Sequence, residues 1–201
     1  MDILMDILIE TAKAEDIGFV KALEVECKLA SWSIEDYRQE VLDANKLFLI
    51  AKNKEENLGF MLARPIMYET DIKPNICHFE TEFHDTYHRK IIESEVEIYN
   101  IAVKIQYRRS HVASRLIEKL IEIASADNLK KIHLEVRKSN TGAIRFYQRK
   151  LFRIVGERKS FYSNPSEDAI LLSRTMPAAN SIKLEKDTKP DITFENTGQI
   201  K

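Results

Sequence analysis

The chain has 201 residues, 44% of them apolar, which suits one well-buried core and is short for two domains. Its formal net charge of −1 at pH 7 argues against a nucleic-acid binder held by bulk electrostatics. No apolar run approaches the roughly 20 residues that span a bilayer, and Cys27 and Cys77 form no CxxC pair. We therefore expect a soluble cytoplasmic protein with no nucleic-acid or membrane partner.

The first elements in chain order are a strand and two helices. Residues 7–12 are rich in β-forming side chains, and apolar residues at helical spacing follow from Ile17 to Cys27. Ser33 and Asp36 have the spacing of a capping box, which predicts a short helix over residues 34–42.

Two apolar runs, 46–52 and 58–63, flank a polar turn and predict a hairpin. From residue 64 to residue 94 periodicity fades and prolines interrupt the chain, which predicts a surface insertion. Its cysteine and histidines, in the spacing CH-x5-H-x3-H, match no strong zinc pattern, so we expect no metal.

The second half carries clearer periodicity. Apolar residues recur at helical spacing from Val112 to Ala124, and Lys131 to Arg137 alternates as a half-buried strand does. Asn140 has the position of an N-cap for a helix ending near residue 150. The other expected elements are strands over 97–103, 152–159 and 168–175, and a flexible polar tail over 178–201.

Between strand 97–103 and the long helix lies QYRRSHVASRL, residues 106–116. The first turn of a helix leaves backbone amides unpaired and attracts phosphate, and Arg108 and Arg109 stand beside it. The turn could hold a diphosphate. Alternatively, the arginines are only solvated and Ser110 only caps the helix.

The ordered blocks EIYNIAV, YRRSHVASRLIE, HLEVRKSNTGAIRFYQRKLF and EDAILLSRTM resemble the GNAT superfamily of acetyl-CoA-dependent N-acetyltransferases. Within it they are most similar to RimI-type ribosomal-protein alanine N-acetyltransferases. The resemblance implies an α/β fold over residues 1–177, with a mixed sheet of about seven strands, helices on both faces and a splay between the two central strands.

The resemblance also implies where acetyl-CoA binds. The family's phosphate signature falls on Arg108, His111 and Ala113, with histidine where glycine is expected; Leu151 replaces a second glycine. We expect that His111, as a first-turn helical residue, needs no positive φ. The implied cofactor-binding residues are Ile101, Val103, Arg108, Arg109, Ser110, His111, Val112, Ala113, Ser114, Asn140 and Tyr147.

For catalysis the resemblance implies Glu135 as general base and Tyr147 as general acid, converging on one cleft. Taken alone, Glu135 could be a strand carboxylate paired with Arg137 or Arg145, and Tyr147 an aromatic at the edge of the core.

The expected activity is acetyl transfer to the N-terminal α-amine of a protein, in particular a ribosomal protein. Two alternatives stay open: a degenerate domain that binds CoA without turnover, and a small-amine acetyltransferase. A further hypothesis is that the insertion shapes the entry for the acceptor peptide.

Overall fold

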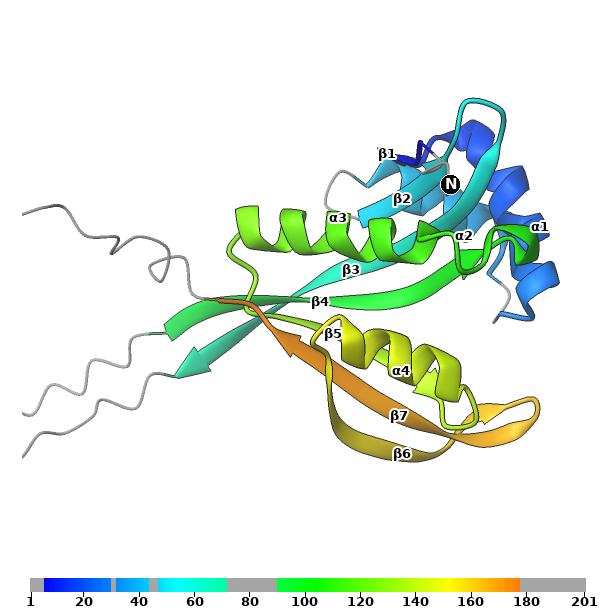
Figure 1. Ribbon diagram of the computed structural model, residues 1–201. Coiled ribbons are helices and arrows are strands. Elements are labelled where there is room, and N and C mark those ends of the chain that lie inside the picture. Colours follow the sequence, from blue (N-terminus) through cyan, green and yellow to red (C-terminus); the bar gives the residue numbers. More distant parts are fainter. Residues whose placement is uncertain (1–5, 30–31, 44–46, 72–89, 178–201) are drawn as a thin grey trace, which may run out of the picture.

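The computed structural model describes residues 6–29, 32–43, 47–71 and 90–177, which form a mixed sheet with helices on both faces (Figure 1). The strands are β1 (Leu8–Thr11), β2 (Leu47–Lys52), β3 (Asn57–Asp71), β4 (Lys90–Val103), β5 (Lys131–Arg137), β6 (Arg153–Ser163) and β7 (Ser166–Thr175). The helices are α1 (Ile17–Cys27), α2 (Ile34–Leu42), α3 (Val112–Ala126) and α4 (Thr141–Arg149), with short 3₁₀ turns η1 (Ala14–Asp16) and η2 (Ile105–Tyr107).

The strands form one seven-stranded sheet in the order β1-β2-β3-β4-β5-β7-β6. β4 and β5 run parallel, and every other neighbouring pair is antiparallel. The predicted mixed sheet of about seven strands is therefore confirmed.

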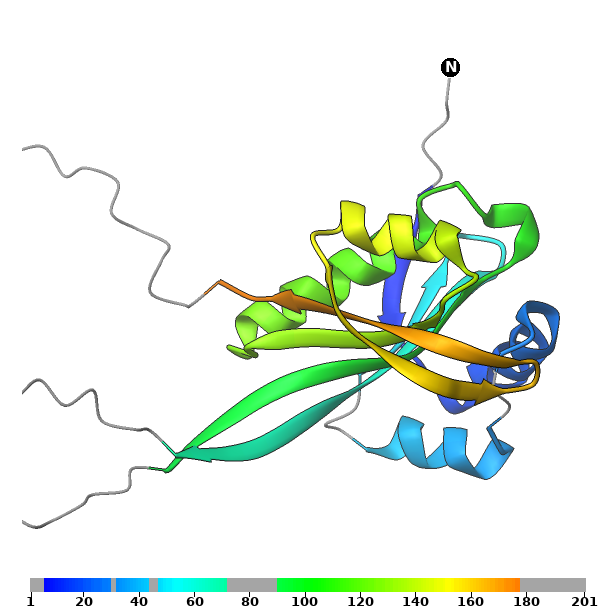
Figure 2. The same ribbon diagram turned by 90° about the horizontal axis from the view of Figure 1, so that it is seen from below.

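Two apolar cores lie on opposite faces of this sheet. α3 and α4 cover one face, where Leu116 and Tyr147 pack against strand residues such as Leu134. α1 and α2 cover the other, where Val20 and Tyr37 are fully buried. Figure 2 shows the two pairs of helices on either side of the sheet. The strict alternation in β5 puts Ile132, Leu134 and Val136 in the α3 core and turns the intervening polar side chains to the other face.

The two central strands separate. β4 pairs with β5 only from Val96 to Ile98, beside Ile132 to Leu134, and a β-bulge follows in β4 at Tyr99. Beyond it β4 stays paired with β3, while β5 stays paired with β7. The strands diverge toward their carboxyl ends (Figure 1), which confirms the predicted splay.

Gly59 holds the end of β4 close to β3. It pairs with Val103, and a Cβ on Gly59 would lie 2.5 Å from the carbonyl oxygen of Ala102. Only glycine permits this approach. The register of β4 at the splay therefore depends on a residue in the preceding hairpin.

The segment 64–94, predicted to be a surface insertion, begins and ends in regular strands. β3 continues to Asp71 and β4 begins at Lys90, so antiparallel pairing covers 64–71 and 90–94. Pro65 does not end β3, because β2 pairs only as far as Ala63 and β3 is an edge strand beyond that point, where proline is tolerated. The cysteine and histidines of the insertion, and the tail 178–201, lie outside the described residues.

Both predicted helix caps are confirmed. The Asp36 N–H donates to Ser33 Oγ at 3.0 Å and the Ser33 N–H donates to Asp36 Oδ2 at 2.9 Å, which completes the capping box of α2. The Ala143 N–H donates to Asn140 Oδ1 at 3.1 Å and starts α4. The Asn140 cap places the start of α4, whose last turn lines the site below.

Candidate active site

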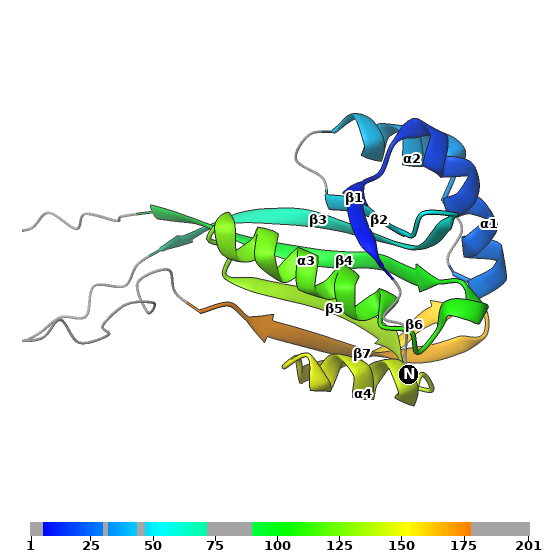
Figure 3. The same cartoon turned by 45° about the horizontal axis from the view of Figure 1, so that its top comes forward.

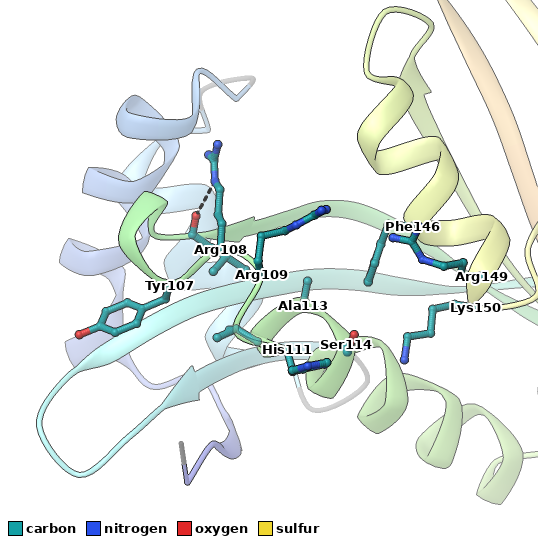
Figure 4. Close-up of a pocket in the computed structure, with 11 residues that line it drawn as sticks. Tyr107, Arg108, Arg109, His111, Ala113, Ser114, Phe146, Arg149 and Lys150 are labelled. Atoms are coloured by element: carbon teal, nitrogen blue, oxygen red, sulfur yellow. Dashed lines mark hydrogen bonds between the residues drawn. The ribbon is translucent and has the colours of Figure 1, made fainter. Parts of the chain in front are cut away.

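A pocket of about 620 Å³ opens where β4 leads into α3 and faces the last turn of α4 (Figure 4). It is lined by Val103, Tyr107, Arg108, Arg109, His111, Val112, Ala113, Ser114, Phe146, Arg149 and Lys150. The first amides of α3 have no carbonyl partner within the helix, so this wall offers hydrogen-bond donors and partial positive charge. With several cationic side chains beside them, the donors suit a phosphorylated ligand.

The turn before α3 is left-handed at two residues. Arg109 has φ 69°, and His111, the N-cap of α3, has φ 63° and ψ 3°. Our expectation that His111 needs no positive φ is wrong, because it precedes the helix instead of occupying its first turn. Leu151, at the second missing glycine, also has a positive φ of 65°. The backbone thus keeps the conformation that glycine favours, at a cost of roughly 1–2 kcal/mol per residue.

Arg108 is engaged by the protein itself. Its Nε donates to the Val103 carbonyl at 3.4 Å and its Nη2 lies 3.4 Å from Cys27 Sγ. Figure 4 shows this side chain directed away from α4, whereas Arg109 extends toward it. Arg108 therefore ties the end of β4 to α1. The Arg109 side chain has no hydrogen bond or ion pair with any residue that the structure describes, so of the two it is the one that can meet a ligand.

Most of the predicted cofactor-binding residues line one pocket. Those that do are Val103, Arg108, Arg109, His111, Val112, Ala113 and Ser114. Ile101, Ser110, Asn140 and Tyr147 are not among its lining residues.

Sequence reasoning missed Tyr107, Phe146, Arg149 and Lys150. For Arg149 and Lys150 the available signal was a basic pair at the end of a helix. This signal was not sufficient, because only the fold shows that this helix end faces the start of α3.

Glu135 lies on β5 and faces the α1/α2 side of the sheet, since its neighbours Leu134 and Val136 enter the α3 core. Its carboxylate makes an ion pair with Arg158 of β6. The Glu135 side chain is 18% exposed, so it remains accessible. The partner is neither Arg137 nor Arg145, the two arginines that the sequence suggested. Arg137 makes other contacts.

Tyr147 is buried on the opposite face, where its ring packs edge-on against Phe146 and Phe152 with centroids 5.2 and 5.6 Å away. Burial raises the pKa of the Tyr147 hydroxyl, and the nearby Tyr162 adds to the rise. The predicted acid and base therefore lie on the two faces of the sheet and do not share the pocket.

Tyr162 of β6 interacts electrostatically with both residues, because it raises the pKa of Tyr147 and its own pKa responds to Glu135. Burial raises its pKa first, and the charge of Glu135 raises it further. Arg137 stacks on the Tyr162 ring at 4.2 Å and donates to the carbonyls of Asn164 and Pro165 at 2.9 and 3.1 Å. The Arg137 side chain thus fixes the β6–β7 turn beside the opening between β4 and β5.

Among the described residues, no group of three or more potential metal-ligating side chains comes together. Within the same ranges, no helix is long and apolar enough to cross a membrane.

Residues 17–151 match the model of the acetyltransferase (GNAT) family. The chain belongs to this family. It is 30% identical over 130 residues to the N-alpha-acetyltransferase of Saccharolobus solfataricus, a match that covers 64% of this chain and 76% of that protein. It is 31% identical over 86 residues to the ribosomal protein bS18-alanine N-acetyltransferase of Escherichia coli K12, covering 42% of this chain. That match spans 58% of the E. coli protein, and one to a Bacillus subtilis relative spans 54%.

Solved structures share the fold. The E. coli ribosomal-protein-S18-alanine N-acetyltransferase superimposes with a TM-score of 0.66 at 20% identity, covering 89% of this chain and 99% of that one. Arabidopsis thaliana NAA60, solved with acetyl-CoA, gives 0.69 at 21% identity, covering 85% and 99%. The GNAT fold of the chain is thereby established.

Proposed function

We propose that this protein transfers the acetyl group of acetyl-CoA to the N-terminal α-amine of a protein. One observation supports it above the others: a cationic pocket at the start of α3 ends at Val103, where β4 has left β5. The named relatives act as N-alpha-acetyltransferases, one of them on ribosomal protein bS18. A ribosomal acceptor and a cytoplasmic location stay predictions.

The residues present fit acetyl-CoA. Amides at the start of α3 and Arg109 would hold its diphosphate, and the end of β4 would supply main-chain partners to the rest of the coenzyme. The amide of Val103 would polarise the thioester carbonyl, an oxyanion-type role. His111 and Leu151 keep the left-handed turns, which favours a working site over a degenerate one.

Proton transfer falls to two residues. Glu135 takes the proton that the acceptor ammonium must lose before its nitrogen attacks the thioester carbon. Tyr147 gives its proton to the sulfur as the carbon–sulfur bond breaks. A tyrosine hydroxyl is already protonated at neutral pH, and burial raises the pKa of Tyr147 further. Because the two lie on opposite faces, the splay is where amine and thioester can meet.

An α-amine suits this base better than a lysine. At pH 7 an amine of pKa about 8 is roughly a tenth neutral, whereas lysine, with a pKa of about 10.4, is almost entirely protonated. The Glu135 carboxylate, already neutralised by Arg158, adds little net attraction for a more basic amine.

The test is acetyl transfer to a panel of peptides that differ in their first residue, followed by mass spectrometry. We expect modification of free α-amines and none of peptides with a blocked N-terminus and an internal lysine. Glu135→Gln and Tyr147→Phe should each lower kcat by about 10²-fold or more. Tight acetyl-CoA binding without transfer to any peptide would instead support a domain that binds the coenzyme without turnover.

A further inference from the structure

Glu97 of β4 is a carboxylate on the same face of the sheet as Glu135. Its neighbours Val96 and Ile98 enter the α3 core, so the Glu97 side chain faces the α1 and α2 side. Glu97 is half-buried and makes no ion pair with any residue that the structure describes. The other ionic side chains on this face, along β5 and along β4 from residue 95, are paired: Glu95 with Lys131 and His133, Glu135 with Arg158, and Arg137 with Glu167.

Arg64 of β3 lies opposite Glu97 in the sheet but is engaged elsewhere. Its guanidinium group forms an ion pair with Glu40 of α2, whose side chain is only 1% exposed. The same group lies over the rings of Trp32 and Tyr99, 4.9 and 5.0 Å from their centroids. The hydroxyl of Tyr99, a neutral group, donates a hydrogen bond to Glu97. Within the described part of the chain, the Glu97 carboxylate therefore keeps its negative charge without a counter-ion.

Glu97 lies in the short stretch where β4 and β5 pair before the splay. That stretch runs from Val96 to Ile98, with Glu97 opposite His133, and Glu135 follows two residues later on β5. A strand spacing of about 4.8 Å and a rise of about 3.3 Å per residue put the Cα atoms of Glu97 and Glu135 roughly 8 Å apart. An extended peptide covers that distance in about two to three residues. An acceptor whose α-amine reaches Glu135 from this face can therefore place the side chain of its second or third residue beside Glu97.

The charge of Glu97 favours a cationic side chain at that place. A half-buried carboxylate without a counter-ion attracts a cation more strongly than an exposed group does, because water screens it less. The α-ammonium of the acceptor does not meet this need, since it must give its proton to Glu135 before the nitrogen attacks. A lysine or arginine side chain, in contrast, keeps its positive charge at neutral pH.

We infer that Glu97 binds a lysine or arginine side chain at the second or third position of the acceptor, and that the protein therefore prefers acceptors with a basic N-terminal segment. This inference rests on the proposed function, because it concerns the acceptor of the same reaction. Glu97 determines specificity by contact with the substrate, and it takes no part in proton transfer.

The experiment measures acetyl transfer, at saturating acetyl-CoA, to three peptides with arginine, glutamine or glutamate at positions two and three. All three start with the residue that the parent accepts best, and arginine is used because its side chain does not compete as an acceptor amine. We expect kcat/KM to be about tenfold higher for the arginine peptide than for the glutamine peptide, through a lower KM. The difference should shrink at high salt.

Two substitutions at Glu97 test the charge itself. Glu97→Gln keeps an oxygen for the Tyr99 hydroxyl and should reduce the preference for the arginine peptide to about twofold or less. Glu97→Lys should reverse the preference in favour of the glutamate peptide, which a purely structural role of Glu97 would not do. Both variants should bind acetyl-CoA as the parent does, because the coenzyme pocket does not include Glu97.

The matched control is Glu122→Gln, which removes the same charge from α3, on the opposite face of the sheet. It should keep the preference of the parent. Equal kcat/KM of the parent for the arginine and glutamine peptides would overturn the inference, and so would a Glu97→Gln variant that retains the preference. No transfer to any peptide would overturn the proposed function as well, so the two failures are distinguishable.

Discussion

Leu151 follows α4 in a conformation that side chains disfavour, with φ 65°, and its own side chain is 70% exposed. Leu151→Gly would relieve roughly 1–2 kcal/mol of strain and cost roughly 0.5–1 kcal/mol in unfolded-state entropy. Little buried contact is lost. We therefore expect the free energy of unfolding to rise by about 0.5–1 kcal/mol in urea titration.

The control for that change is Leu42→Gly, at an equally exposed leucine in the last turn of α2. Here glycine should lower the free energy of unfolding by about 0.5–1 kcal/mol. If both glycine variants were destabilised alike, the left-handed conformation of Leu151 would store no strain.

Tyr147 links stability to alkaline pH. Its pKa in the folded protein is raised by burial, whereas an unfolded tyrosine ionises near pH 10. The folded state holds its proton where the unfolded state has lost it. Its contribution to stability is therefore complete below about pH 10 and is lost as the pH rises further. Tyr147→Phe should make the decline of unfolding free energy above pH 10 shallower by up to about 1.4 kcal/mol per pH unit; an unchanged decline would contradict the burial of the hydroxyl.

Asn140 acts at the scale of an element, because its cap starts the helix that carries Tyr147 and Arg149. Asn140→Ala should cost about 1 kcal/mol of stability. Asn140→Asp keeps an oxygen for the Ala143 N–H and should keep the stability of the parent. If the Asn140 amide also donates to the coenzyme, as the family resemblance implies, calorimetry will show weaker acetyl-CoA binding by the aspartate variant; parental affinity would limit Asn140 to capping.

Local signals predicted the elements well where one pattern dominated. The capping box of Ser33 and the apolar stripe of α3 were both sufficient, since each depends on neighbours within one or two turns. The extension of β3 past Pro65 was not predictable in this way. A proline ends a central strand but not an edge strand, and the sequence does not say where β2 stops pairing.

The same limit applied to the site. Arg109 and His111 were found because a strand, a turn and a helix follow one another in the chain. Arg149 was missed, because it lines the same pocket as Arg109 and His111 only when α4 packs beside α3. The pairing of Glu135 with Arg158 joins β5 to β6 across β7 in the sheet order, so the spacing of these residues in the sequence could not predict it.

At the scale of the whole molecule, the splay between β4 and β5 determines where the two substrates could meet. Figure 3 shows α3 lying over β4 and β5, with α4 beside β7. The proposed coenzyme pocket opens on the α3 and α4 side, and Glu135 faces the α1 and α2 side. Two substrates can therefore approach from opposite faces and meet where the pairing between β4 and β5 ends.

The most direct test of that arrangement is calorimetry of the full chain with acetyl-CoA, for the parent and for Arg109→Gln. We predict that the parent binds acetyl-CoA and that the variant binds it about 10- to 100-fold more weakly, because it lacks the free guanidinium at the start of α3. Absence of binding by the parent at millimolar acetyl-CoA would contradict the assignment of the pocket and of the function built on it.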